Sequence, residues 1–333
     1  MLVRILSALI IVITVASVWL WNEYNLAMST PVIFNEAKII EINKGDSFSR
    51  ITRKLRKKDI KIKPRWFKAI AYKNGVAKKL KAGEYELKPG LTMPDILALF
   101  VEGKSRQYSI TFPEGWSFKQ LVQEIQNNPH LRQTLDVIDN KTLMSQLGSD
   151  YEHPEGLFFP DTYFFDKNAT DFSILKTAYQ KMQLILQSEW QQKEKDLPID
   201  SAYQALILAS IIEKETGAAI ERPQIAGVFT RRLRKGMLLQ TDPTVIYGMG
   251  ERYNGNIRRK DLREKTVYNT YVIKGLPPTP IAMPGKAAIN AALHPAKGKT
   301  LYFVAMGQGA GTHVFSATLR EHNNAVNKYQ RRR

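Results

Sequence analysis

The sequence predicts an α+β protein in three parts: a single N-terminal transmembrane helix, a small βααβ module and a larger mixed α+β domain with a central buried helix. Three observations predict this fold class. An uncharged apolar run opens the chain, a strongly basic segment with strand and helix patterns follows it, and residues 202–217 are apolar on most sides of a helix. The chain contains no cysteine, so disulfide and thiolate chemistry are excluded.

The apolar run at residues 5–21 has no charged side chain and is long enough to cross a bilayer as a helix. Trp19 and Trp21 close it, as is typical at a membrane interface. Because Arg4 precedes the run and Glu23 follows it, the positive-inside rule predicts a cytoplasmic N-terminus. A cleaved signal peptide is the alternative, but the run is longer than a signal core and lacks a clear A-x-A site. We expect a single-pass protein of the cytoplasmic (inner) membrane, with its other domains on the periplasmic or extracytoplasmic side.

The formal net charge of +18 is unevenly distributed, because residues 36–106 hold 19 Lys and Arg against 8 Asp and Glu. Such a balance favours an anionic partner, which can be a nucleic acid, a lipid headgroup or an acidic polymer. The predicted topology argues against nucleic acid, since it places the basic segment outside the cytoplasm.

The basic segment has the order strand, helix, helix, strand. Residues 37–42 read as the first strand, Ser47 as a helix N-cap, Pro64 as the start of the second helix and residues 81–87 as the second strand. With the phrases KGDSFSRI and LKAGEYEL, this order resembles a LysM-type module, a small fold that binds polymers of N-acetylated sugars. A generic basic βααβ domain is the alternative.

Helical patterns dominate the middle of the chain. Residues 119–147 are predicted to be helical throughout, and residues 171–190 form a long amphipathic helix. A further helix covers residues 223–235, and its basic run at residues 231–235 is expected to be a solvated face near the helix C-terminus.

Irregular segments and two strands make up much of the remainder. Residues 155–163 are predicted as a shaped loop. Three later segments are rich in Pro, Gly, Tyr, Asn and Thr and are interpreted as loops, with short helical pieces such as 286–292 between them: 239–248, 268–271 and 275–285. Strands are expected at residues 301–306 and 312–316, joined by the glycine-rich residues 307–311.

The buried helix at residues 202–217, AYQALILASIIEKETG, carries two carboxylates near its end. At about 100° per residue, Glu215 shares a stripe with Leu208 and Ile211, whereas Glu213 points well over 90° away. A carboxyl on an apolar face is partly desolvated, which raises its pKa and keeps a proton available near neutral pH, as a general acid requires. The alternative is that both glutamates end the helix in salt bridges.

Other catalytic centres are not indicated. The five histidines show no metal-ligand spacing, and neither HExxH nor G-x-S-x-G occurs, so no metal and no cofactor are predicted. Carboxylate chemistry remains, in a cleft whose Tyr, Asn, Gln and Thr side chains suit sugar hydroxyl and acetamido groups. A standard glycosidase needs a second carboxylate. Asp161 and Asp242 are candidates, but no pattern places either opposite Glu215.

Several motifs, in this order, resemble the endolytic murein transglycosylase family (MltG, or YceG-like): EGLFFPDTY, ASIIEKET, RRLRKGMLLQTDPTVIYGMG, YNTYVIKGLPPTPIAMPG, ALHPA, LYFVA and THVFS. The resemblance covers nearly the whole chain and departs from the family at Thr279 and Met283. It implies non-hydrolytic cleavage of the β-1,4 bond between N-acetylmuramic acid and N-acetylglucosamine. One glutamate protonates the glycosidic oxygen and then acts as base on the muramyl C6 hydroxyl, which closes a 1,6-anhydro ring.

The family's catalytic glutamate matches Glu215, immediately before Thr216. The resemblance also implies a set of residues that line the glycan cleft: Gln240, Thr241, Asp242, Tyr268, Asn269 and Tyr271. For each of these, a structural role in holding loops together is the alternative, and Asp242, which precedes Pro243, is also a candidate helix-cap or turn residue. Glu213, Thr216 and Asp161 are candidate supporting residues. The implied partners are peptidoglycan glycan strands and penicillin-binding protein synthases.

These interpretations divide the chain into five predicted parts. They are a cytoplasmic stub and anchor (1–23), a linker (24–36), the LysM-like glycan-binding module (37–106), a connecting region (107–150) and a catalytic transglycosylase domain (151–330). Two rival functions remain open at this stage: a two-carboxylate muramidase or glucosaminidase, and a non-catalytic peptidoglycan anchor.

Overall fold

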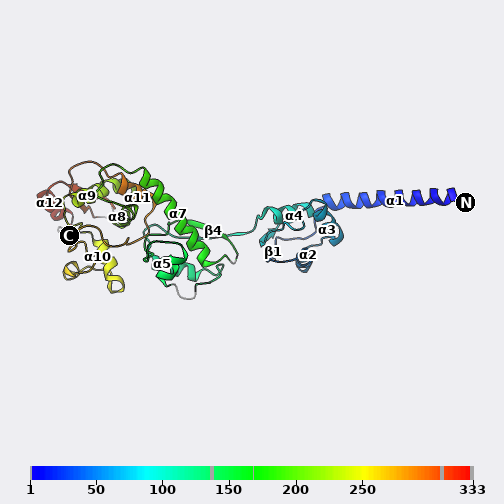
Figure 1. Cartoon of the computed structure of the whole chain (residues 1–333), viewed down its shortest axis with the longest axis horizontal. Coiled ribbons are helices and arrows are strands. Elements are labelled where there is room, and N and C mark those ends of the chain that lie inside the picture. Colours follow the sequence, from blue (N-terminus) through cyan, green and yellow to red (C-terminus); the bar gives the residue numbers. More distant parts are fainter. Residues whose placement is uncertain (1, 136–138, 168, 308–310, 331–333) are drawn as a thin grey trace. The chain divides into compact units, whose positions relative to one another are not determined.

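The computed structural model describes the chain except for residues 1, 136–138, 168, 308–310 and 331–333. It has two compact units, Met1–Tyr108 with Phe164–Asn168 and Ser109–Tyr163 with Ala169–Arg333. Helices dominate both units, and the strands form three two-stranded sheets (Figure 1). The predicted mixed α+β class with one apolar N-terminal helix is confirmed at this level.

Helix α1 spans Leu2–Ser29 and is long and apolar enough to cross a membrane. Its side chains are exposed along the apolar run, but its last turns enter the core of the first unit. Ala27 is 3% exposed, and Tyr24 and Met28 pack against the same core cluster. The helix therefore continues without a break from the apolar run into the adjoining module.

The module has the predicted order of elements. Strands β1 (Lys38–Ile42) and β2 (Gly83–Leu87) pair antiparallel, with Lys38 opposite Leu87. Helices α2 (Phe48–Lys57) and α3 (Pro64–Lys73) connect them, and α4 (Met93–Glu102) follows β2. The core is made by apolar side chains from all of these elements, among them Ile40, Leu55, Phe67, Leu87 and Phe100.

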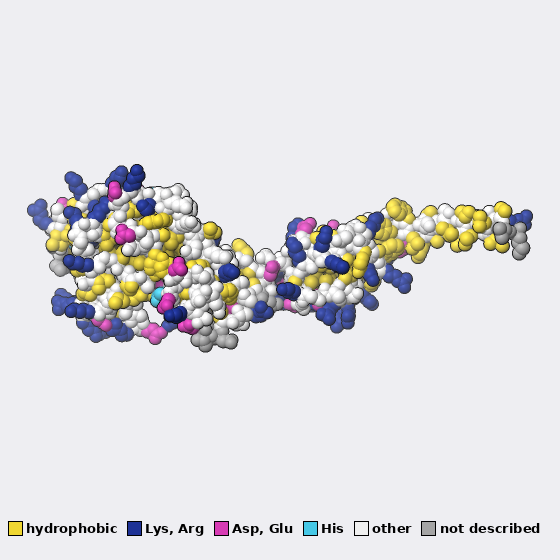
Figure 2. All heavy atoms as spheres, in the orientation of Figure 1, with side chains coloured by type: hydrophobic (Ala, Val, Ile, Leu, Met, Phe, Trp, Pro, Cys, Tyr) yellow, Lys and Arg dark blue, Asp and Glu magenta, His cyan; other side chains and the backbone are white. Residues whose placement is uncertain are grey.

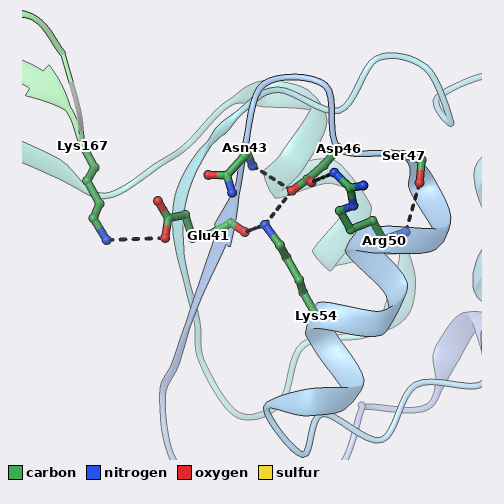
Figure 3. A network of polar contacts seen from close by, with 7 residues as sticks. All are labelled: Glu41, Asn43, Asp46, Ser47, Arg50, Lys54 and Lys167. Carbon is green, nitrogen blue, oxygen red and sulfur yellow. Dashed lines mark hydrogen bonds and ion pairs between the residues drawn. The ribbon is translucent and has the colours of Figure 1, made fainter. Parts of the chain in front are cut away.

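A buried aspartate fixes the turn between β1 and α2 (Figure 3). The Asp46 carboxylate, 2% exposed, accepts hydrogen bonds from the Asn43 amide at 2.9 Å and from Lys54 Nζ at 2.6 Å. Arg50 Nη1 lies 3.3 Å from its other oxygen, and the Ser47 hydroxyl caps α2 by accepting from the Arg50 amide. The hydrogen bond from Lys54 lowers the pKa of Asp46. A single carboxylate therefore bridges two cations of α2 and neutralises one unit of their positive charge.

The predicted continuous helix at residues 119–147 is wrong. The chain forms α5 (Phe118–Asn127) and α6 (Asn140–Gln146), and residues 136–138 lie outside the described part. Asn128 is extended, with φ −80° and ψ 114°. It precedes Pro129, whose ring disfavours the helical region for the residue before it.

Four helices pack around α8 in the second unit. Helix α8 (Ala202–Glu215) contacts α7 (Asp171–Gln191), α9 (Arg222–Arg234), α10 (Asp242–Met249) and α11 (Lys286–Leu293) (Figure 1). Every residue from Ala205 to Ile212 is buried. The predicted central buried helix is therefore present.

Helix α10 corrects the loop predicted at residues 239–248. Thr241 is its N-cap, and proline follows in the first turn, where a missing N–H costs nothing. Val245 and Met249 are buried and hold the helix to the rest of the unit.

The remaining short elements surround this helical core. Strand β3 (Gln107–Thr111) pairs with β4 (Thr162–Asp166), so the last residues of the loop predicted at 155–163 are a strand. Strands β5 (Tyr302–Ala305) and β6 (His313–Ser316) form an antiparallel hairpin followed by α12 (Leu319–Tyr329). Among the described residues there are also three 3-10 turns: η1 (Ala219–Glu221), η2 (Gly250–Arg252) and η3 (Asp261–Arg263). Residues 308–310 of the glycine-rich link lie outside the described residues.

Candidate active site

A cavity of about 500 Å³ opens at the C-terminal end of α8. Glu215, the last residue of α8, lines it, because Thr216 turns to an extended conformation and ends the helix there. The opposite wall comes from the β5–β6 hairpin and α12. The cleft thus combines the carboxyl at the end of α8 with polar, aromatic and aliphatic side chains.

The Glu215 carboxyl has an unusual proton affinity. Burial is the largest cause and raises its pKa to about 7, while the nearby charge of Asp242 acts in the same direction. A hydrogen bond from the Thr241 hydroxyl to Oε1 opposes both. Near neutral pH the carboxyl is therefore available in both its acid and its base form.

Three threonines form a buried support behind this hydrogen bond. The Thr241 amide donates to Thr270 Oγ1 at 3.1 Å, and Thr244 Oγ1 donates to the Thr241 carbonyl at 2.7 Å. The hydroxyls of Thr244 and Thr270 are 2.8 Å apart, and both side chains are fully buried. Thr244 and Thr270 were not predicted from the sequence, although they stand in the TDPT and YNTY phrases.

Gln240, Asp242 and Tyr271 share the cavity with Glu215. Gln240 has a positive φ of 53°, a conformation that non-glycine residues adopt at a cost, and its amide donates to the Thr270 carbonyl at 3.1 Å. The Tyr271 hydroxyl donates to Asp242 Oδ1 at 2.6 Å. Gln240 and Tyr271 are therefore each held at the cavity by a hydrogen bond.

Tyr268 and Asn269 are not among the residues that line this cavity. The Tyr268 hydroxyl is 2.9 Å from Thr279 Oγ1. Asn269 is 1% exposed, and its side chain bonds three backbone groups: the carbonyls of Asp261 and Glu264 and the amide of Tyr271. The hydrogen bonds of Tyr268 and Asn269 therefore hold neighbouring loops together.

Asp161 also lies apart from the cavity lining. Its carboxylate pairs with Lys181, and this hydrogen bond lowers the pKa of Asp161. Its Oδ1 accepts from the Thr162 amide at 2.7 Å, at the start of β4. Of the two predicted second carboxylates, only Asp242 shares a cavity with Glu215.

Glu213 anchors the end of α8. Its Oε1 accepts from Arg222 Nη2 at 2.9 Å and its Oε2 from the Gly285 amide at 3.0 Å, and its side chain is only 6% exposed. Arg222 also lies 3.6 Å from Glu114, whose pKa is raised by burial and by the charge of Glu213. This cluster joins α8, α9 and the loop at residues 275–285, and neither Arg222 nor Glu114 was predicted from the sequence.

The solvated face predicted at residues 231–235 is wrong for Arg232, which is 7% exposed and lines the cavity. Its Nε donates to the Leu301 carbonyl at 2.7 Å, and its Nη1 donates to the Leu239 carbonyl at 3.0 Å and to Gln240 Oε1 at 3.2 Å. Because the acceptors come from distant segments, helix periodicity could not reveal this role.

A glutamate–histidine pair was also missed. Glu221 accepts from the His313 amide at 2.8 Å, and its second oxygen is 2.8 Å from His313 Nδ1. The pair is nearly enclosed, with His313 lining the cavity beside the β5–β6 hairpin. This contact fixes the orientation of the imidazole at the wall of the cavity.

A second buried carboxyl, Glu155, has its pKa raised to about 7 by burial. It accepts hydrogen bonds from the Phe118 amide at 2.9 Å and the Tyr247 hydroxyl at 3.2 Å. Glu155 lines a different cavity, with His153 and the first turns of α5. It therefore connects α5 with α10 and is not part of the cleft at Glu215.

A carboxyl with a raised pKa at a helix end, in an open cleft of polar and aromatic side chains, is the arrangement expected of an acid/base enzyme for a polar substrate. The model of the YceG-like family matches residues 40–328. This chain belongs to that family.

Individual relatives agree with the family assignment. The endolytic murein transglycosylase of Bacillus subtilis (strain 168) is 32% identical over 326 residues, which is 92% of this chain and 89% of that protein. Its counterpart in Streptococcus pneumoniae serotype 2 is 27% identical over 319 residues, and the match spans 57% of that longer protein. A crystal structure of a yceG-like protein from Listeria monocytogenes, 32% identical, matches 87% of this chain and 99% of its own with a TM-score of 0.55.

Proposed function

We propose that this protein is a lytic transglycosylase that cuts peptidoglycan glycan strands internally, with Glu215 as its single acid/base group. One observation carries the proposal: the Glu215 carboxyl lines an open cavity, and its pKa is raised to about 7. The family membership and the names of the relatives supply the substrate class.

In the proposed reaction, protonated Glu215 donates its proton to the oxygen that links muramyl C1 to the next sugar. The C1–O bond breaks, and positive charge develops at C1 and the ring oxygen. The Glu215 carboxylate then takes the proton of the C6 hydroxyl on the same muramyl unit, and O6 closes on C1 to give the 1,6-anhydro ring. The proton is returned to Glu215, so no water is consumed.

The neighbours of Glu215 have distinct proposed roles. Thr241 holds Oε1 by its hydrogen bond, which leaves Oε2 for the glycosidic oxygen and the C6 hydroxyl. Asp242 lies close enough to raise the pKa of Glu215, so its negative charge also favours the positive charge that develops at C1. Gln240 and Tyr271 supply hydrogen-bonding groups to the sugar from the same wall.

The arrangement of the chain in the cell is part of the proposal. Helix α1 anchors the protein in the cytoplasmic membrane with the N-terminus inside, which leaves the cleft on the side where peptidoglycan lies. The βααβ module binds glycan strands in the manner of LysM-type folds. Contact with penicillin-binding protein synthases rests on the family resemblance alone.

The deciding experiment is mass spectrometry of peptidoglycan fragments released by the full chain in water enriched in ¹⁸O. We expect 1,6-anhydromuramyl ends without ¹⁸O. Reducing ends that carry ¹⁸O would instead establish a two-carboxylate hydrolase. Binding without any fragments, equal in the native chain and Glu215→Gln, would establish a non-catalytic anchor.

A further inference from the structure

Most of the positive charge lies in one short part of the first unit. Residues 44–81 contain fifteen Lys and Arg and two Asp, a formal +13 out of +18 for the chain. One of the two acids, Asp46, is already neutralised by Arg50 and Lys54. Figure 2 shows Lys and Arg side chains over this module, next to the apolar surface of α1. Such a density of unneutralised cations indicates an anionic partner.

Helix α3 lies across α1 immediately beyond the apolar run. Lys63, just before α3, pairs with Glu23 of α1 at 3.1 Å, and the Trp66 ring is 5.9 Å from that of Tyr24. Lys73, at the other end of α3, has its Nζ 4.5 Å from the centre of the Tyr24 ring. Ten helical residues span about 15 Å. Since both ends of α3 reach the same level of α1, α3 crosses α1 and does not run along it.

The position of this crossing along the axis of α1 is close to the membrane interface, because the apolar run of α1 ends in Trp19 and Trp21. Glu23 lies about 3 Å farther along the helix axis than Trp21, so α3 stands at the height of the lipid headgroups when α1 spans a bilayer. The module core fixes this height, because Ala27 is buried in it.

The side of α3 that faces away from the module core is basic and carries one aromatic ring. Phe67 and Ile70 point into the core, whereas Arg65, Lys68 and Tyr72 are exposed at a spacing of three and four residues, on the opposite side. Arg65 and Lys68 have no carboxylate partner among the residues that the structure describes. Cations beside an exposed tyrosine are typical of protein surfaces at a membrane interface.

We propose that this outer side of α3 lies on the membrane surface and binds the phosphate groups of anionic lipids, so that the module is held against the bilayer. The inference rests on the proposed anchorage by α1. Helix α1 continues into the module without a break, so this side of α3 stays at the height of the lipid headgroups. This position favours lipid phosphate over an acidic glycan as the ligand. A glycan ligand would not require that position.

The absence of cysteine from the chain allows a clean test with single labels. A fluorophore is attached at Ala69→Cys, on the exposed side of α3, or at Lys104→Cys as a reference. The reference is distant from α1, because Thr92 bridges to Pro31 at the start of α4 and Lys104 follows the other end of that helix. The labelled full-length chains are placed in nanodiscs of phosphatidylcholine with or without phosphatidylglycerol, and headgroup-located quenchers are added.

In anionic discs we expect quenching at residue 69 to exceed that at residue 104 at least threefold, and to fall at least twofold in neutral discs or at high salt. Arg65→Glu combined with Lys68→Glu should reduce quenching at residue 69 to the reference level. The matched charge reversal on α2, Arg53→Glu with Arg56→Glu, should leave it unchanged.

Equal quenching at the two sites in both kinds of disc, with the chain retained in the disc, would refute the surface contact but not the anchorage. Loss of the chain from the discs would refute the anchorage itself. An equal effect of the two double reversals would refute the assignment to α3. Protection of residue 69 by soluble glycan strands, without any lipid dependence, would establish a glycan as the occupant. None of these outcomes alters the fragment analysis that tests the proposed function.

Discussion

Glu215→Gln should abolish catalysis and at the same time stabilise the fold above neutral pH. Glutamine has the shape of the protonated carboxyl but cannot give up a proton. Loss of a general acid typically costs 10²- to 10⁴-fold in rate, and here the same group is also the base, so we expect at least about 10³-fold loss of kcat/KM. The stability gain follows from the burial that raises the pKa of Glu215 from 4.5 to about 7.

The sign and size of the gain follow from proton linkage. Below pH 4.5 both the folded and the unfolded chain hold the Glu215 proton, so the native carboxyl costs nothing relative to glutamine. Between pH 4.5 and pH 7 the unfolded chain releases the proton while the folded chain retains it, and the free energy of unfolding falls. Above pH 7 the cost is complete, at about 3 kcal/mol for a shift of this size, and Glu215→Gln removes it.

Urea unfolding of the full chain in mild detergent, followed by circular dichroism between pH 4 and pH 8.5, measures this difference. The curves of the native chain and Glu215→Gln should converge near pH 4 and separate steadily up to about pH 7.5. Glu155→Gln is a useful comparison, because its pKa is also about 7 while it lies outside the cleft; it should stabilise without abolishing cleavage. A pH-independent difference between the native chain and Glu215→Gln would refute the raised pKa.

Three further predictions address the neighbours of Glu215. Thr241→Val removes the hydrogen bond that lowers the pKa of Glu215. The alkaline limb of the pH profile of kcat/KM should therefore shift to higher pH by about one unit. A shift to lower pH, or no shift, would contradict the assigned contact. Glu213→Gln should lower kcat/KM tenfold or less. It should lower the free energy of unfolding in urea by about 3 kcal/mol, because Arg222 loses its buried partner. A loss of activity as large as that of Glu215→Gln would contradict the role of Glu213 as an anchor. Asn269→Ala should cost about 3 kcal/mol and lower activity only as far as it unfolds the chain, which thermal melts and initial rates together can test.

The sequence predicted those features that depend on local periodicity. Helix α8 is apolar on most sides and its end was visible, so the orientation of Glu215 could be derived from helical phase. Helical phase also placed Glu213 on another side of the helix. It could not show that the Glu213 side chain is buried, because the partners of Glu213, Arg222 and Gly285, come from other segments. Arg232 was misjudged for the same physical reason: its charge is solvated by the backbone carbonyls of Leu301 and Leu239, which both lie outside its own helix.

The errors in the predicted elements have local explanations. Asn128 before Pro129 is a helix-ending signal that the apolar pattern of residues 119–147 concealed. Helix α10 was taken for a loop because Thr, Asp and Pro dominate its start, although the same residues are typical of a helix N-terminus. In both places the turn and cap chemistry was more informative than composition.

The surroundings of Glu215 act on its proton in opposite directions. In the proposed mechanism, this balance is the reason why one carboxyl suffices. Burial and the charge of Asp242 favour the acid form, whereas the Thr241 hydroxyl favours the base form. A hydrolase with two carboxylates separates the roles by giving one group a high pKa and the other a low one. In the proposed mechanism one carboxyl both donates a proton and recovers one within a single turnover. Neither transfer is strongly uphill in free energy when the pKa of that carboxyl is about 7. Thr241 and Asp242 are therefore the positions at which the balance between the two steps can be changed without removing the reacting group.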